Sequence, residues 1–221
     1  MKLLIIIFGI AASLFIYRLV ERSNDKRREK YIDRYYFHKG IKAKLAQRYP
    51  NLSDQQLELI LKGLREYFQV CRQARKKLVS MPSQAVDEAW HQFILSTRLY
   101  SEFCNKAFGY YLHHTPAEAM PTSTIAKEGI KRSWRLACAR EKIDPRRPTQ
   151  LPLLFAIDGL LAIPNGFFYQ LNCREHAERR GNTIYCAGDI ACSTGCIGDF
   201  GGEQTEGADC ASDGGGGCSG D

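Results

Sequence analysis

The chain has 221 residues, of which 44% are hydrophobic and 25% are charged, and its formal net charge is +7. Residues 1–150 carry 28 Lys/Arg and 14 Asp/Glu, a net of +14, whereas residues 151–221 carry 3 and 10, a net of −7. This division excludes a uniformly basic nucleic-acid-binding domain, so nucleic acid is not an expected partner. The central part of the chain, roughly 160 residues, is long enough for one domain with a hydrophobic core.

The first predicted element is the most apolar segment of the chain, LLIIIFGIAASLFIYRLV at residues 3–20, whose one charge is on Arg18. Eighteen helical residues span about 27 Å, close to the thickness of a bilayer core. The sequence therefore predicts a transmembrane anchor over residues 1–21, with the lipid bilayer as its partner. A cleaved signal peptide is the alternative, but apolar residues continue past the small residues 11–13 and no polar cleavage region follows.

A basic helix is expected over residues 22–50, directly after the anchor. Positive charge on this side of the span exceeds that before it, which predicts a single-pass membrane protein whose C-terminal domain is cytoplasmic. The same charges are suited to anionic lipid head groups. In a reducing cytoplasm, the nine cysteines are expected to be free thiols or metal ligands rather than a disulfide framework.

Three more helices are predicted before residue 142. Ser53, with Gln56 three residues later, forms a capping box that begins a helix running to about residue 79. Ser83 begins the next helix, whose apolar face continues until Gly109 stops or kinks it. The third is expected from about residue 122 to residue 141.

The remaining residues divide into an apolar part and a glycine-rich part. Residues 151–171 are apolar but interrupted, so we interpret them as segments that cover the core, with an interfacial or re-entrant piece as the alternative. Residues 186–221 contain 11 Gly and seven acids and cannot bury enough apolar surface to fold. The sequence thus predicts an all-α, bundle-like domain over residues 51–185, followed by a disordered acidic Gly/Cys-rich tail.

One segment resembles a known family. Residues 82–116 read PSQAVDEAWHQFILSTRLYSEFCNKAFGYYLHHTP, and this pattern resembles the glycine-rich domain-containing protein family of plants and bacteria. The Gly/Cys-containing C-terminal end is also similar to tails in that family. The resemblance implies that the matching residues form the structural centre of the domain: Asp87, Trp90, His91, Tyr100, Cys104, Gly109, His113, His114 and Pro116.

Within that segment, Asp87 and His91 are four residues apart and therefore share a helix face. His113 and His114 follow in the loop after the helix and can fold back toward that face. Imidazole and carboxylate groups are ligands of zinc and iron, so these four residues are a candidate metal site, with Cys104 as a further contributor. The alternative is a structural network in which Asp87 orients His91 by a hydrogen bond.

A second candidate metal site has the spacing C-x2-H-x9-C-x5-C-x3-C near the C-terminal end. Any four of its residues could form a tetrahedral zinc site, although a paired CxxC is absent. The members are Cys173, His176, Cys186, Cys192 and Cys196.

The sequence contains no GxSxG, P-loop or dinucleotide-binding signature. We therefore expect a membrane-anchored interaction or scaffold module that faces the cytoplasm, with no enzymatic activity assigned to it. The first alternative is a zinc- or iron-dependent enzyme that uses Asp87, His91, His113 and His114. The second alternative is a Cys-rich tail that handles metal or takes part in redox chemistry.

Overall fold

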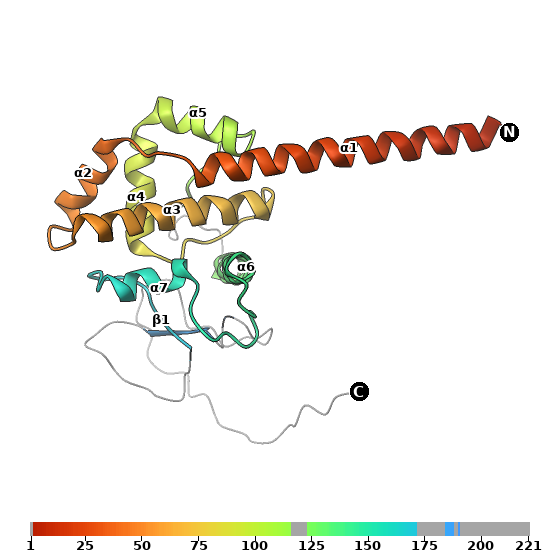
Figure 1. Cartoon of the computed structure of the whole chain (residues 1–221). Coiled ribbons are helices and arrows are strands. Elements are labelled where there is room, and N and C mark those ends of the chain that lie inside the picture. The colour runs from red at the N-terminus through yellow and green to blue at the C-terminus, as the bar shows by residue number, and fades with distance from the viewer. Residues whose placement is uncertain (1, 116–122, 172–183, 188–189, 191–221) are drawn as a thin grey trace, which may run out of the picture.

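The computed structural model describes residues 2–115, 123–171, 184–187 and 190 (Figure 1). This part of the chain is mostly helical, as the sequence predicts, with one short pair of strands. The elements are α1 (Lys2–Asp33), α2 (Lys39–Arg48), α3 (Asp54–Ala74), α4 (Gln84–Leu95), α5 (Thr97–Ala107), α6 (Ser123–Glu141), α7 (Leu153–Leu160), β1 (Phe168–Gln170) and β2 (Ile184–Cys186).

Helix α3 is the centre of the domain, and it contacts α1, α2, α4, α6 and α7. Its start is the predicted capping box, in which Ser53 and Gln56 each accept a hydrogen bond from the other's backbone N–H. It ends at Ala74, earlier than predicted, because Arg75 adopts the left-handed conformation with φ of 49°. Gly63 allows α4 and α7 to lie close to α3, because an added Cβ at this position would lie 2.8 Å from the Val86 side chain.

The single helix predicted after Ser83 is two helices, because the chain turns at Ser96 between α4 and α5. This turn folds α5 back against α1 and α4. The ring of Phe103 then lies 5.3 Å from that of Phe93 and 4.8 Å from that of Phe68. Aromatic packing across the turn therefore stabilises a break in the helix that helical periodicity alone does not reveal.

Helix α1 docks on α3 through ion pairs. Arg72 of α3 lies 2.5 Å from Asp25 and 3.6 Å from Glu29, and Arg75 lies 3.1 Å from Glu21. These acids are spaced four residues apart and therefore form one stripe along α1. The basic helix expected over residues 22–50 is thus the second half of α1, and α2 follows as a separate helix.

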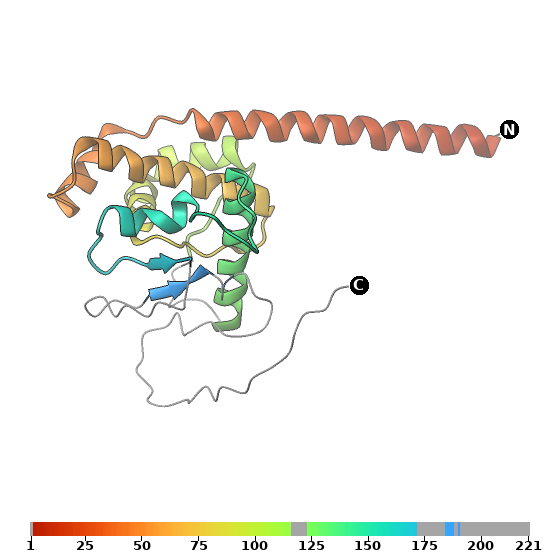
Figure 2. The same ribbon diagram turned by 60° about the horizontal axis from the view of Figure 1, so that its bottom comes forward.

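The expected membrane anchor over residues 3–20, and with it the single-pass location, is not supported. Across the residues that the structure describes, no helix is both long enough and apolar enough to cross a bilayer. The apolar residues are the beginning of a longer helix, α1, which continues to Asp33. In Figures 1 and 2, this end of α1 extends away from the rest of the domain.

A buried carboxylate joins α7 to the start of α4. Asp158 of α7 is 1% exposed and accepts hydrogen bonds from the Ser83 hydroxyl at 2.7 Å and from the backbone N–H groups of Gln84 at 2.7 Å and Ala85 at 3.2 Å. It also accepts from the backbone N–H of Phe167 at 2.9 Å. The N–H groups of Gln84 and Ala85 have no partner within their own helix turn, so Asp158 both pairs them and complements the helix dipole.

The predicted all-α fold is confirmed in the residues that the structure describes, and one short strand pair is added near the C-terminal end. Strands β1 and β2 pair in parallel, with Tyr169 opposite Tyr185 (Figure 2). Beyond β2, Ala187 and Ile190 are buried. The remainder of the predicted tail lies outside the described residues.

We predict that Asp158→Asn lowers the free energy of unfolding by about 3 kcal/mol or more, measured by urea denaturation. The amide removes the charge and offers an NH2 donor to neighbours that are themselves donors. Asp144→Asn is the matched control, because the exposed Asp144 caps one backbone N–H, that of Arg146, and should cost much less. Equal losses for the two variants would contradict the role assigned to Asp158.

Candidate functional site

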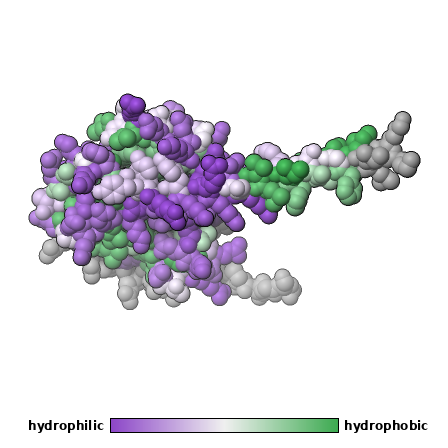
Figure 3. Space-filling model, turned by 45° about the horizontal axis from the view of Figure 1, so that its top comes forward, coloured by the Kyte–Doolittle hydropathy of each residue, from purple (hydrophilic) through white to green (hydrophobic). Residues whose placement is uncertain are grey.

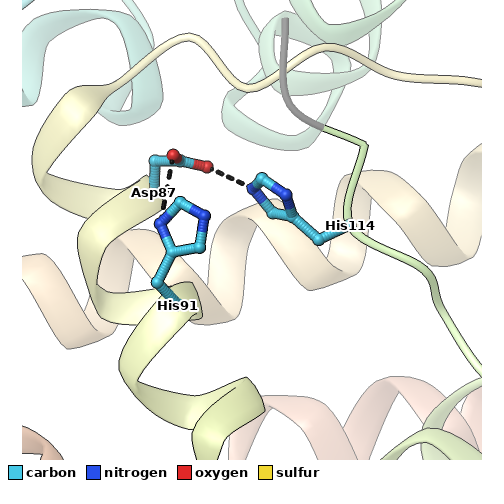
Figure 4. Close-up of side chains that lie close together, drawn as sticks. All are labelled: Asp87, His91 and His114. Carbon is cyan, nitrogen blue, oxygen red and sulfur yellow. Dashed lines mark hydrogen bonds and ion pairs between the residues drawn. The ribbon is translucent and has the colours of Figure 1, made fainter. Parts of the chain in front are cut away.

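Three polar side chains from two separate segments meet on one side of α4 (Figure 4). Nε2 of His114 lies 2.7 Å from Oδ1 of Asp87, and Nδ1 of His91 lies 3.4 Å from Oδ2 of the same carboxylate. The two imidazole centroids are 4.4 Å apart. One potential ligand atom from each residue lies within 4.8 Å of the others, which makes this trio a candidate metal centre. We call it the Asp87 cluster.

Helix α4 supplies two members of the cluster from consecutive turns. The Ser83 hydroxyl caps the helix by accepting from Val86 N–H at 3.1 Å. Trp90, one residue before His91, is 3% exposed and anchors the adjacent side of α4 in the core. With Trp90 inside, the helical period leaves Asp87 and His91 together at the edge of the core, where a polar pair can be hydrated or coordinated.

His114 reaches the cluster through a hydrogen-bonded relay. Nε1 of Trp90 donates to the Tyr100 hydroxyl at 3.0 Å, and that hydroxyl donates to the Leu112 carbonyl at 2.5 Å. Burial raises the pKa of Tyr100, so its hydroxyl keeps the proton that it donates. The relay fixes the backbone two residues before His114, whose ring then packs against Trp90 with centroids 4.4 Å apart.

Gly109 allows the chain to reverse between α5 and the histidines. Its φ is +78°, a conformation that favours glycine. Its N–H donates to the carbonyls of Cys104 and Asn105 and closes the end of α5. A Cβ at this position would also collide with the guanidinium of Arg28. Glycine here therefore serves both the turn and the packing of α1.

Other residues predicted for this site lie elsewhere. The ring of His113 packs on Tyr111, with centroids 4.8 Å apart, and is not part of the Asp87 cluster. Cys104 is fully buried in the aromatic core, where desolvation raises its pKa. It is therefore a core residue and not a ligand of this cluster. Pro116 lies outside the described residues.

The Asp87 cluster lines a cavity of about 660 Å³. Its walls include Trp90, Tyr110 and Phe167, and two lysines, Lys76 and Lys77, stand beside the aromatic residues. The volume is within the range of small-molecule sites in proteins. The sequence does not reveal that Lys76 and Lys77 line a cavity. The basic end of α3 is already explained by its complementing the helix dipole, and no motif marks the other lining residues.

The second candidate metal site is not supported at Cys186, which is disulfide-bonded and so offers no thiolate to a metal. Its other four members lie outside the described residues. The expectation that every cysteine is a thiol or a ligand is therefore wrong at Cys186. By contrast, Cys71, Cys104 and Cys138 are free and buried, and desolvation raises the pKa of Cys71 to about 12.

Residues 27–190 match the family model described as UCP032817-like. The chain belongs to the UCP032817-like family. The expected membership of the glycine-rich domain-containing protein family is wrong, because that resemblance rested on one short segment, whereas the UCP032817-like match covers most of the chain. No curated protein and no solved structure matches the chain. All three residues of the Asp87 cluster lie within the UCP032817-like region.

We predict that Tyr100→Phe lowers the free energy of unfolding by about 1–3 kcal/mol, because it leaves the Trp90 N–H and the Leu112 carbonyl without a partner. Thermal and urea unfolding of the full chain measure the change. Tyr36→Phe is the control, since Tyr36 is 73% exposed and should change stability by less than about 0.5 kcal/mol. A Tyr100→Phe protein as stable as this control would show that the relay does not hold the histidine segment.

Proposed function

We propose that this domain is a metal-dependent enzyme that binds one zinc or ferrous ion through Asp87, His91 and His114 and acts on a small molecule in the adjoining cavity. The observation that carries the proposal is the convergence of two imidazoles and one carboxylate at the wall of that cavity. Two nitrogen donors and one oxygen donor form a ligand set found in catalytic zinc sites and in non-haem iron sites.

The spacing of the donors supports a shared ion. Zinc–nitrogen and zinc–oxygen bonds of about 2.0–2.2 Å place neighbouring ligand atoms roughly 3–4 Å apart. The candidate ligand atoms already lie within 4.8 Å of one another, so side-chain rotation can bring them to an ion without moving the backbone. Without an ion, the Asp87 carboxylate pairs with both histidines. A cation bound between the three side chains would replace the imidazole N–H groups as partners of the carboxylate.

An open position favours catalysis over a structural role. Structural zinc sites are closed by four protein ligands, whereas catalytic sites keep a place for water or substrate. Three protein ligands come from the described residues, and the cavity adjoins them. The His114 side chain is 10% exposed and the His91 side chain 46% exposed, so one side of the cluster is held by the protein and the other is accessible. A bound metal would lower the pKa of its water and polarise a substrate oxygen.

We predict that the purified full chain binds one zinc ion per chain, measured by titration calorimetry and by metal analysis after dialysis. His91→Ala, His114→Ala and Asp87→Ala should each weaken zinc binding at least about a hundredfold, since even outer partners of metal ligands contribute 10–100-fold. The same titrations with ferrous ion under anaerobic conditions identify the preferred metal.

His113→Ala is the matched control, because it removes a neighbouring imidazole that is not part of the cluster. It should bind zinc as the unmodified protein does. If the unmodified protein binds no zinc or ferrous ion, or if all four variants bind equally well, the cluster is a structural hydrogen-bond network and the proposal fails.

A second candidate function is an interaction module, and the projecting end of α1 favours it. Ile7, Ile10, Leu14 and Tyr17 are each more than half exposed, and their spacing of three and four residues is that of a helix-pairing seam. Figure 3 shows apolar side chains along the part of α1 that stands clear of the rest of the surface. Since exposed apolar surface of this extent marks interaction sites, we propose that α1 pairs with α1 of a second copy of the chain.

Light scattering of the full chain at tens of micromolar should then show a dimer or a larger assembly. Replacing Ile10 and Leu14 by Glu should yield monomers, because two charges per chain would enter an apolar seam. The control is the exposed pair Leu95 and Leu160, which lies outside α1, replaced by Glu in the same way. A monomeric unmodified chain, or equal effects of both replacements, would rule out pairing through α1.

A further inference from the structure

We infer that the molecule bound in the cavity is an organic anion with an apolar body, whose charged group is held by Lys76 and Lys77. The inference extends the proposed function, on which it rests for the position of the reacting group. Lys76 and Lys77 lie on another part of the cavity wall, where α3 ends.

The two lysines differ from the other cations at the end of α3. Arg72 and Arg75 pair with acids of α1. Within the described residues, by contrast, neither Lys76 nor Lys77 has a carboxylate within ion-pair distance. Both line the cavity. No carboxylate of the described residues therefore neutralises their charge, which is available to a ligand.

The backbone positions Lys76 for this role. Arg75 and Lys76 have φ of 49° and 68°, two successive left-handed conformations that non-glycine residues rarely adopt. Strain of this kind gathers at ligand sites, where the surrounding structure holds it in place. The turn brings Nζ of Lys76 to 5.3 Å from the ring centroid of Tyr110, a cation–π contact that keeps the ammonium at the cavity wall.

Charge and apolarity in the cavity define the ligand. Among the described residues that line it, Asp87 is the one carboxylate, and it is engaged by two imidazoles. The two lysines therefore give the cavity a positive potential, which a bound divalent cation would increase. Leu112, Ile130 and Phe167 add apolar wall, which suits a hydrocarbon or aromatic body rather than a polar one.

The length of the connecting segment limits the distance between Tyr110 and His114. Tyr110, which contacts Lys76, and His114, which contacts Asp87, are four positions apart in the chain. A chain of that length spans at most about 14 Å. A molecule of medium length can therefore reach the lysines with its anionic group and the Asp87 cluster with its other end.

Three probes with the same eight-carbon body test the charge preference: octanoate, octan-1-ol and octylammonium. Binding to the zinc-treated full chain is followed by titration calorimetry, and metal content is measured on the same samples. We expect octanoate to bind about tenfold more tightly than octan-1-ol, since each lysine contributes modestly at an accessible site. Octylammonium should bind most weakly.

The double variant Lys76→Gln/Lys77→Gln should lose the preference, so that octanoate and octan-1-ol bind within about twofold of each other. The matched control is Lys44→Gln/Lys106→Gln, because Lys106 also lies over a tyrosine ring, that of Tyr31 at 6.0 Å, but outside the cavity. The control should keep the tenfold preference.

Equal binding of octanoate and octan-1-ol by the unmodified chain overturns the inference. So does a preference that survives Lys76→Gln/Lys77→Gln, because the anion would then be bound elsewhere. Zinc bound without any octanoate preference leaves the proposed function standing and removes the inference alone. An octanoate preference in a chain that takes up no metal removes the metal-dependent function and retains the anion site.

Discussion

The hydrogen bonds that Asp158 accepts at the start of α4 are the constraint on which the site depends. The carboxylate comes from α7, more than seventy residues along the chain, and it pairs N–H groups that would otherwise be buried without a partner. It thereby fixes where α4 begins and how the helix is oriented against α3 and α7. Since Asp87 and His91 follow within two turns, the position of both depends on this contact.

The other half of the Asp87 cluster is positioned relative to the same helix. Trp90 of α4, through the Tyr100 hydroxyl, holds the Leu112 carbonyl, and His114 packs on the Trp90 ring. Both segments that contribute to the cluster are therefore held by buried groups of one helix. A metal or substrate site needs such support, because ligands must be oriented before the ion or the substrate arrives.

The end of α3 serves packing and the cavity together. Arg72 and Arg75 hold α1 through its acidic stripe, and the two left-handed residues that follow direct Lys76 toward Tyr110. In this short basic segment, the two arginines thus stabilise the packing of α1, and Lys76 lies at the cavity. The cavity then combines a candidate metal centre, aromatic walls and lysines without carboxylate partners among the described residues. An amphipathic anion, as inferred above, would use the aromatic walls for its apolar body and the lysines for its charge.

The sequence by itself determined the elements whose signals are local. The capping box at Ser53, the cap at Ser83 and the extent of α6 are set by residues within a turn or two, and so is the shared face of Asp87 and His91. Only the tertiary structure decided that His114, and not its neighbour His113, joins them, because the Tyr100 relay fixes the orientation of this segment. It also decided the break at Ser96, the strand pairing and the lysine wall. These features come from contacts between residues far apart in the chain. Hydrophobic periodicity and motif spacing reflect only nearby residues and cannot predict such contacts.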